Sequence, residues 1–451
     1  MILPYQKIYN SKNLTETYRT LSTKSIGILF LFALFMSSIG LVQVTIIMFV
    51  LVAFGFLIFN KKLLIALYII LLPTDGIFLQ EYNIAGIINI NVAINFLATI
   101  SLFPELYKKR KLDFFQKSSI YIICVFVFYL IFVNCKNTYF SLMSTSQAIN
   151  RSIYFLFEYL PLILLIKLMK KQGIIKLIKS AIYFSMIFLT ISALLSPFLY
   201  DLGFKIGAEE GLEIASLNRY GGLYGKGDEN SFGIFSAMIA GFILSIFENR
   251  KINHYEIIVL VSAILGVLLS GSRAAIISIV FISLYYIKRN FNSGKSFKLI
   301  FFFSIIGVLL APQIGKVLLR FDTFSSQLET ETSSNRIGKW ILYLNHMFEN
   351  PSIFFHGNKS IFSLTTYETR RAAHNFYVQI VYDSGLLPFI LLIYGYFKFF
   401  LNSQKNKFLL KPFYYIFPVL METMTVSAFS LLAYAALIIT INASVNNKKL
   451  I

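Results

Sequence analysis

Apolar residues occur along this chain in long blocks separated by short polar stretches. Blocks such as Leu29–Phe35 and Ile276–Ile282 lack the in–out alternation of a β-barrel strand. They therefore predict helices, whose backbone hydrogen bonds close within one segment, as lipid requires. Most blocks approach the roughly 17–25 residues with which a helix crosses a bilayer. The predicted segments are 25–40, 42–60, 63–74, 86–104, 118–134, 153–169, 180–198, 231–248, 257–271, 274–288, 299–316, 376–400, 412–423 and 425–443.

These fourteen segments leave two counts of membrane crossings open. Segments 63–74 and 412–423 are short enough to be re-entrant, so twelve crossings is the alternative. Either even count puts both termini on one side. The polar stretch 1–24 lacks a small-residue cleavage site, so the first apolar run is expected to be a retained anchor. We predict an all-α polytopic membrane protein with about 12–14 transmembrane helices in a single integral membrane domain, 1–451.

Composition agrees with a membrane protein. The 451 residues are 57% hydrophobic, only 14% are charged, and the mean hydropathy is +0.70, whereas a soluble domain carries about a quarter charged residues. The net charge of +20 could point to nucleic acid, but in a membrane protein the distribution of charge matters more than its sum. With the N-terminus inside, 28 of the 41 lysines and arginines fall in inner segments. This follows the positive-inside rule, and nucleic acid is not an expected partner.

Two outer loops, at about 199–230 and 317–375, interrupt the apolar pattern. Within 317–375, apolar residues recur on one face of a helix that starts near Ile337 and that Pro351 ends. The chain's single tryptophan lies on that face, which suits an amphipathic helix at the membrane surface. The face comprises Ile337, Trp340, Ile341, Leu344, Met347 and Phe348.

Arginines in and between these loops are the first candidates for chemistry. The first outer loop contains Asn218-Arg219-Tyr220-Gly221-Gly222 and then Lys226 among further glycines. Glycines let a ligand approach the backbone, and arginine binds phosphate oxygens through two parallel hydrogen bonds. The alternative is a flexible, solvated loop. Gly271-Ser272-Arg273 lies between two apolar segments, where an arginine either faces a polar cavity or anchors an interfacial turn.

The second outer loop adds further candidates. Arg336 lies at the start of the predicted surface helix, and Arg370-Arg371 precede His374-Asn375 where the chain re-enters the membrane. A histidine at that position can act as a general base near neutral pH, although a lone histidine is more often structural. Glu158, inside a predicted span, is either functional or bonded between helices.

The patterns that the chain lacks narrow the chemistry. There is no Asp-x-Asp in the outer loops, no phosphate-binding Gly-x-x-x-x-Gly-Lys-Ser/Thr and no His-Glu-x-x-His. Cys124 and Cys135 show no metal-ligand spacing. We therefore expect neither a metal site nor a cofactor.

Taken together, these motifs resemble those of the O-antigen ligase and O-antigen polymerase superfamily of bacterial envelope glycosyltransferases. The resemblance covers about residues 215–390. It rests on the order of motifs, and Leu386 to Phe389 depart from the family pattern, which has a further small residue there. The matching motifs are Asn218-Arg219-Tyr220-Gly221-Gly222, Leu269-Ser270-Gly271-Ser272-Arg273-Ala274, Asn335-Arg336 with Trp340, and His374-Asn375 with Gly385.

The resemblance implies a metal-independent glycosyl transfer at the periplasmic face of the bacterial inner membrane. In the orientation that the basic residues favour, both termini are cytoplasmic and 317–375 is a periplasmic loop. The donor would be an oligosaccharide on undecaprenyl pyrophosphate, held among membrane lipids. Arg219, Arg273 and Arg336, with Lys226, would bind the pyrophosphate. His374 would take the proton of the acceptor hydroxyl.

Three functions remain open within this reading. A polymerase, which we favour, transfers the glycan to another lipid-linked repeat unit, and a chain-length regulator protein is a candidate partner. The chain is rich in Phe, Ile, Asn and Lys, residues of A/T-rich codons that are common in polysaccharide gene clusters. A ligase would use the lipid A core as acceptor. A flippase or transporter is less favoured, because the ionisable residues concentrate in outer loops rather than through two related halves.

Overall fold

The protein is described from a computed structural model. The described residues are 51–53, 55–58, 61–74, 83–84, 88–105, 107, 111–112, 114–139, 144–168, 172–196, 220–222, 229–291, 336–358, 375–405 and 413–421, with isolated positions between 294 and 315 and at 438. The predicted segment 25–40, and most of 42–60, 299–316 and 425–443, lie outside them.

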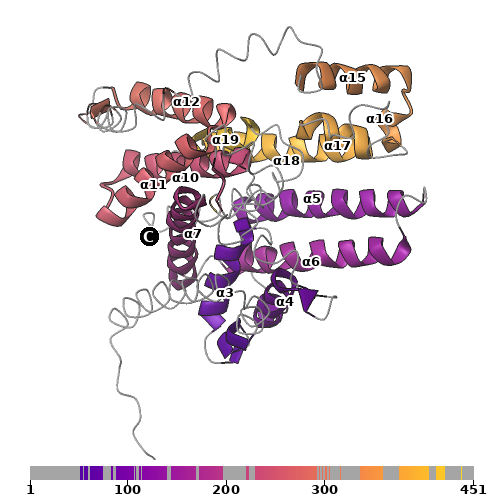
Figure 1. The fold of residues 1–451 in the computed structure, drawn as a ribbon, viewed down its shortest axis with the longest axis horizontal. Coiled ribbons are helices and arrows are strands. Elements are labelled where there is room, and N and C mark those ends of the chain that lie inside the picture. Colours follow the sequence, from indigo (N-terminus) through magenta and orange to yellow (C-terminus); the bar gives the residue numbers. More distant parts are fainter. Residues whose placement is uncertain are drawn as a thin grey trace, which may run out of the picture.

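Nearly all of this described part is helical (Figure 1). It also contains two-residue strands, β1 (Asn83–Ile84) and β2 (Ile88–Asn89), which pair antiparallel, the short 3-10 helices Leu72–Thr74 and Phe103–Glu105, and short connections such as 220–222, 271–272 and 357–358. The helices are α3 (Lys61–Leu71), α4 (Ile90–Leu102), α5 (Phe114–Tyr139), α6 (Thr145–Leu168), α7 (Gln172–Leu194), α10 (Glu229–Asn249), α11 (His254–Ser270), α12 (Arg273–Arg289), α15 (Arg336–Glu349), α16 (Ile353–His356), α17 (Phe376–Ser384), α18 (Leu386–Lys405) and α19 (Phe413–Met421).

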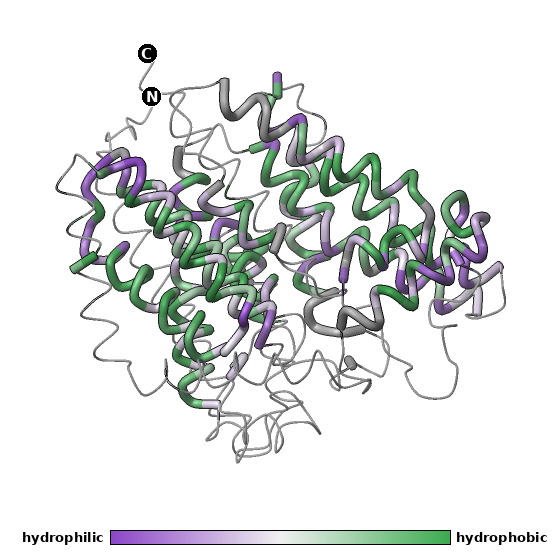
Figure 2. The backbone as a smooth tube through the Cα atoms, turned by 90° about the horizontal axis from the view of Figure 1, so that it is seen from above, coloured by the Kyte–Doolittle hydropathy of each residue, from purple (hydrophilic) through white to green (hydrophobic). Residues whose placement is uncertain are grey.

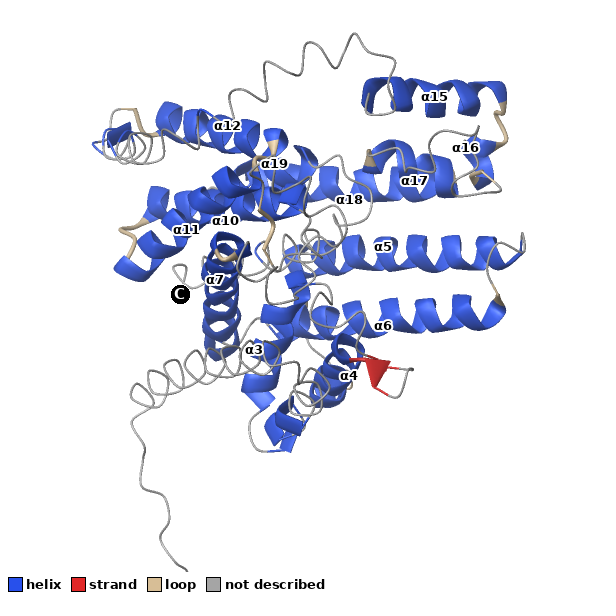
Figure 3. Cartoon of the chain, viewed as in Figure 1, coloured by secondary structure: helices blue, strands red, loops and turns tan. Residues whose placement is uncertain are grey.

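Several of these helices are long and apolar enough to cross a membrane. Four satisfy both criteria, at Gln116–Tyr139, Thr145–Leu168, Ile174–Leu194 and Glu229–Glu248. Figure 2 shows hydrophobic stretches along most of the helices, and in Figure 3 helix is the dominant element. The chain is an all-α polytopic membrane protein, as the block pattern predicts. The total of 12–14 crossings stays a prediction.

The helices form two neighbouring groups. On the right of Figure 1, α5 lies beside α6, α18 packs against α5, and α15 to α17 lie close by. On the left, α10 packs against α11, α12 and α19, and α11 also packs against α7. α10 is the central helix of this second group, since 89% of its apolar window is buried. At Gly241 the backbone of α19 comes so close that a Cβ atom would collide with the Tyr414 carbonyl.

The predicted segment 376–400 is two helices rather than one. Gly385 separates α17 from α18 with a φ of 82°, in the region that favours glycine. A side chain there would also meet the carbonyl oxygens of Phe355 (2.7 Å) and Phe354 (2.9 Å). The break therefore lets the end of α16 lie directly on the backbone between α17 and α18.

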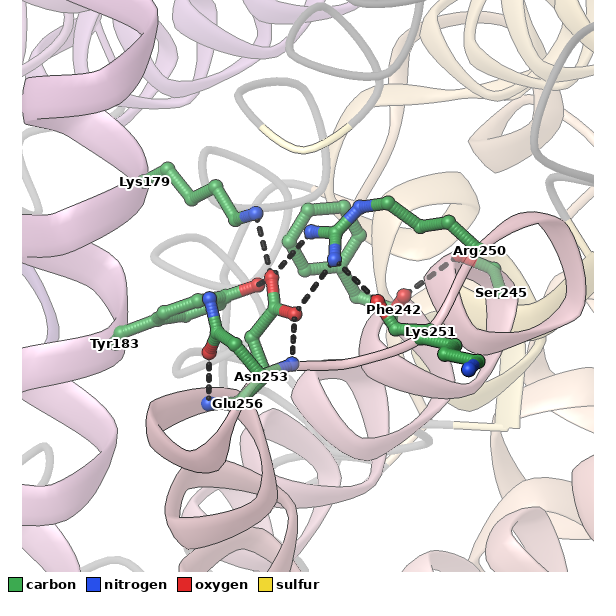
Figure 4. A network of polar contacts seen from close by, with 8 residues as sticks. All are labelled: Lys179, Tyr183, Phe242, Ser245, Arg250, Lys251, Asn253 and Glu256. Atoms are coloured by element: carbon green, nitrogen blue, oxygen red, sulfur yellow. Dashed lines mark hydrogen bonds and ion pairs between the residues drawn. The ribbon is translucent and has the colours of Figure 1, made fainter.

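A charged cluster ties α7, α10 and α11 together at the ends predicted to face inward (Figure 4). The Glu256 carboxylate accepts hydrogen bonds from Lys179 (2.7 Å) and from both terminal nitrogens of Arg250 (2.6 and 3.0 Å). Asn253 and Glu256 also form a reciprocal capping box at the start of α11. Burial alone would raise the pKa of Glu256, which lies just before the predicted span 257–271, but these hydrogen bonds outweigh it and hold the pKa at about 2.

Candidate active site

The turn between α11 and α12 presents Arg273 at the start of a helix. Gly271 ends α11 in the left-handed conformation, with a φ of 55°, and its N–H donates to Leu268. Ser272 is the N-cap of α12, and its hydroxyl accepts from the Ala275 N–H. The sequence Gly-Ser-Arg therefore stops one helix and starts the next. Arg273 itself is half-buried, and its Nη1 atom is buried.

The first arginine motif is bound to this same turn. The Tyr220 N–H donates to the Leu269 carbonyl across 2.9 Å, which joins the segment 220–222 to the end of α11. Gly222, at a φ of 58°, lies against the end of α7, where a Cβ atom would come within 2.9 Å of the Ala193 Cα. Arg219 and Lys226 lie outside the described residues, so their predicted roles stay predictions, although Arg219 directly precedes the bonded Tyr220.

The start of α10 completes this junction. A Cβ atom on Gly233 would lie 2.9 Å from the Ser272 Cβ and 3.0 Å from the Ala275 Cβ, so α10 and the start of α12 are in close contact there. Four parts of the chain therefore meet: the end of α7, segment 220–222, the start of α10 and the α11–α12 turn. Such a junction can gather positive charge from segments far apart in the sequence.

The amphipathic helix of the second loop is confirmed as α15, with Arg336 as its first residue. Its apolar face is divided. Met347 is buried, whereas Ile341, Leu344 and Phe348 are 50%, 38% and 69% exposed. α15 packs against α17, whereas α12 packs against α10 and α19, so Arg336 and Arg273 belong to different groups of helices. Of Arg336 only the backbone is described.

The nine-residue spacing from Asn375 to Gly385 corresponds to one short helix. The Asn375 side chain accepts hydrogen bonds from the backbone N–H groups of Tyr377 (3.0 Å) and Val378 (3.2 Å), so it caps the start of α17. The Gly385 N–H donates to Val381 (2.8 Å) and ends the helix. His374, the predicted base, directly precedes the cap and lies outside the described residues.

A buried polar network next to α17 is absent from the sequence-based prediction. Asp383, only 4% exposed, accepts hydrogen bonds from Gln379 (2.7 Å) on its own helix and from the Tyr129 hydroxyl (3.2 Å) on α5. Lys136, also on α5, donates to the carbonyl oxygens of Asn358 (2.7 Å) and of Asp383. The network thus joins α5, the chain after α16, and α17.

This network extends to α15 through Tyr382. The Tyr382 hydroxyl accepts a hydrogen bond from Asn358 (2.6 Å) and lies 3.1 Å from the Nδ1 atom of His346. The ring of Tyr343 packs edge-on against that of Tyr382, with centroids 4.6 Å apart. Burial raises the pKa of Tyr343, and the nearby carboxylate of Asp383 raises it further, so this hydroxyl stays protonated.

One available signal would have revealed part of this network. Asp383 lies within the predicted span 376–400, and an ionisable residue inside a span is a functional candidate, the rule that singled out Glu158. Glu158 is half-buried in α6, and its backbone carbonyl accepts a hydrogen bond from Tyr68 (2.7 Å). The groups that accept hydrogen bonds from Lys136 could not be recognised in the sequence, because they are main-chain carbonyls.

Within the described ranges, no three His, Cys, Asp or Glu side chains are grouped so that they could hold a metal ion. Cys124 and Cys135 are free thiols.

Comparison with known proteins gives one match. Residues 258–393 match the family model described as "O-Antigen ligase". The match runs from α11 into α18 and includes Arg273, Arg336, His374 and Gly385, whereas Arg219 and Lys226 precede it. It confirms the resemblance to the O-antigen ligase and polymerase superfamily over this segment. No curated protein matches the chain, and no solved structure matches it.

Proposed function

We propose that this membrane protein, whose residues 258–393 carry the O-antigen ligase family domain, is an O-antigen polymerase. It would transfer an undecaprenyl-pyrophosphate-linked glycan onto another lipid-linked repeat unit at the periplasmic face of the inner membrane. The observation that carries the glycosyl-transfer part of the proposal is the family match, because the matched segment includes Arg273, Arg336 and His374. The preference for a polymerase rests on the composition of the chain.

The arginines would bind the leaving pyrophosphate. In the transfer, the bond between the anomeric carbon and the phosphate oxygen breaks, and negative charge grows on the pyrophosphate. Guanidinium groups in a site of low dielectric constant stabilise that charge most effectively. The hydrogen bond between Tyr220 and Leu269 supports a joint role for Arg219 and Arg273, because it joins their two segments. Arg336 and Lys226, from the two outer loops, would add positive charge.

His374 would act on the acceptor. A neutral imidazole can take the proton from the attacking hydroxyl while the new glycosidic bond forms and the undecaprenyl pyrophosphate leaves. The cap at Asn375 supports this role, because it fixes the backbone directly after His374 at the start of α17.

A ligase is the second candidate function, because the matched family is described by that activity. The same donor chemistry would serve both enzymes, and only the acceptor would differ: a second lipid-linked repeat unit for a polymerase, the lipid A core for a ligase.

The glycans of a strain that lacks this protein separate these functions. A polymerase predicts lipopolysaccharide capped with a single repeat unit, which the wild-type gene restores to a polymer. Accumulation of lipid-linked polymer would instead identify a ligase. Single repeat units trapped on the cytoplasmic side would identify a flippase, and would refute the glycosyltransferase proposal.

The transfer is also expected to proceed without a metal ion, since arginines supply the positive charge. Purified protein should keep its rate of transfer in excess EDTA. A loss of activity that Mg²⁺ or Mn²⁺ restores would contradict this part of the proposal.

A further inference from the structure

Helices α15 and α17 meet at two buried tyrosines. The ring of Tyr343 on α15 packs edge-on against that of Tyr382 on α17, with centroids 4.6 Å apart. The Tyr382 hydroxyl also lies 3.1 Å from the Nδ1 atom of His346, one turn further along α15. One position on α17 therefore contacts two successive turns of α15, and this fixes how far one helix can slide along the other.

The two helices run in the same direction. After α15 only three residues precede α16, and the end of α16 lies against the end of α17. A Cβ atom on Gly357 would collide with the Asp383 carbonyl, and the Asn358 N–H donates to the Tyr382 carbonyl across 2.7 Å. In Figure 1, α16 lies at one end of the pair formed by α15 and α17. Because both helices end at α16, both start on the side away from it.

Equal spacing along the two helices brings their starts to the same level. Arg336, the first residue of α15, precedes Tyr343 by seven residues, and Asn375, the cap of α17, precedes Tyr382 by the same number. At 1.5 Å per residue, each start lies about 10 Å from the tyrosine contact. Seven residues also make nearly two turns, so position 336 falls on the face of α15 that carries Tyr343. His374 is one peptide bond from Asn375, with its Cα about 3.8 Å away, so the predicted base follows the start of α17 directly.

We propose that Tyr343 is a positioning residue for glycosyl transfer: by packing on α17 it holds Arg336 and His374 at the same level. The inference rests on the proposed function, because it takes Arg336 as a pyrophosphate-binding residue and His374 as the base. The acceptor hydroxyl loses its proton while its oxygen bonds to the anomeric carbon and the pyrophosphate leaves, so the two residues must keep a fixed separation. Tyr343 touches no reacting atom. A displacement of about 1 Å between the two groups can slow such a reaction roughly a hundredfold.

Steady-state transfer by purified protein tests this role. Tyr343→Ala removes the ring and should lower kcat about tenfold to a hundredfold. The KM for the lipid-linked donor should stay within about threefold, because Arg219 and Arg273 still bind the pyrophosphate. Tyr343→Phe keeps the ring and should recover most of kcat. Tyr286→Ala is the matched control: Tyr286 is equally buried, but it stacks on Phe247 in the other group of helices, so kcat should stay within about threefold of wild type.

A double substitution separates positioning from general destabilisation. If Tyr343 acts by placing Arg336, then Arg336→Ala should cost much less activity in Tyr343→Ala than in the wild type, because residues that act together are not additive. In Tyr286→Ala, the Arg336→Ala change should cost as much as in the wild type. Equal costs in all three backgrounds would overturn the inference, and so would a wild-type kcat of Tyr343→Ala.

Cysteine cross-linking tests the direction of the two helices without any need for activity. With Cys124 and Cys135 replaced by serine, a short bifunctional thiol reagent should join Trp340→Cys to Val378→Cys, because a parallel pair puts these positions at nearly the same level. It should not join Met347→Cys to Val378→Cys, which lie about 12 Å apart along parallel helices. The reverse result would mean antiparallel helices and would overturn the inference. A protein that cross-links as expected but transfers no glycan would refute the proposed function, and with it the positioning role, while the parallel pair would stand.

Discussion

Arg273 illustrates how a single residue acquires a functional environment. Its helix starts at a serine cap directly after a left-handed glycine. Four residues earlier, the Leu269 carbonyl accepts a hydrogen bond from Tyr220, the residue that follows Arg219. Glu256 shows the contrasting case, because its carboxylate is saturated by Lys179, Arg250 and the Asn253 backbone. Arg273 thus lies where several loops meet, whereas Glu256 holds α7, α10 and α11 together.

Substitution of the arginines tests the junction. Arg219→Ala, Arg273→Ala and Arg336→Ala should each reduce polymer roughly a hundredfold or more with protein levels intact, because a charged partner of the pyrophosphate is lost. Lysine at the same positions keeps the charge but loses the paired hydrogen bonds, so partial activity is expected. Polymer of normal length and amount from all three alanine variants would exclude a pyrophosphate role for these residues.

The stability that Glu256 contributes should depend on pH. Its pKa is lowered from 4.5 to about 2 in the folded protein, so its contribution is complete above about pH 4.5 and disappears as the pH falls through 2. The shift corresponds to at most about 3–4 kcal/mol, and less in practice because Arg250 and Lys179 are partly exposed. In detergent, the gap in Tm between wild type and Glu256→Gln should therefore narrow from pH 6 to pH 3.

A matched control for that measurement is Glu349→Gln, at the exposed end of α15, which should show almost no gap at either pH. A Glu256→Gln gap that stays constant between pH 6 and pH 3 would mean that the ion pairs do not contribute in this way.

At the scale of elements, α17 is the unit that organises the candidate site. Asn375 starts it, Gly385 ends it, and Tyr382 and Asp383 connect it to α15 and α5. Because α17 is short and bounded on both sides, a change in its position moves the residue before its cap directly.

Substitution of His374 should separate catalysis from loop structure. His374→Ala should lower transfer by roughly 10²–10⁴-fold, the usual contribution of a positioned base. His374→Gln should be as inactive, because glutamine can keep a hydrogen bond but cannot accept a proton at neutral pH. Both are measured with purified protein at saturating donor. Normal transfer by the glutamine variant would show that His374 is structural.

The second outer loop contains two other histidines, His346 and His356, and they are not equally suitable as controls for the His374 substitutions. His356 is exposed and its Nδ1 atom lies 2.8 Å from the Gly357 carbonyl, so His356→Ala should stay largely active. His346 is within hydrogen-bonding distance of the buried Tyr382 hydroxyl. Its replacement by alanine should disturb the contact between α15 and α17, which makes His356 the better control.

At the scale of the whole molecule, the proposed chemistry requires both arginine loops on the outer face of the membrane. Reporter fusions after residues 225 and 345 should be active outside, and those after 110 and 405 inside, because 28 of the 41 basic residues then face the cytoplasm. An inner signal at 345 would contradict the mechanism, since Arg336 and His374 would face away from a periplasmic donor.

The sequence alone determined where most of the described helices lie and what class of protein they form. Helix α15 agrees with its predicted start and end, because its signals are local: a 3.6-residue apolar period and a proline. The turn at Gly271, and the resemblance of its motif to the family pattern, could also be recognised from the local sequence. The sequence did not reveal that 376–400 breaks at Gly385, because the reason is a close approach of Phe355 from a distant segment.

Tertiary structure alone decided which segments meet. The bond from Tyr220 to Leu269 and the bonds from Lys136 to Asn358 and Asp383 all end on main-chain carbonyls. Every residue carries such a carbonyl, so no residue type or spacing marks these acceptors in the sequence. The lysine can be read from the sequence, but its partners are set by how α5, α16 and α17 pack.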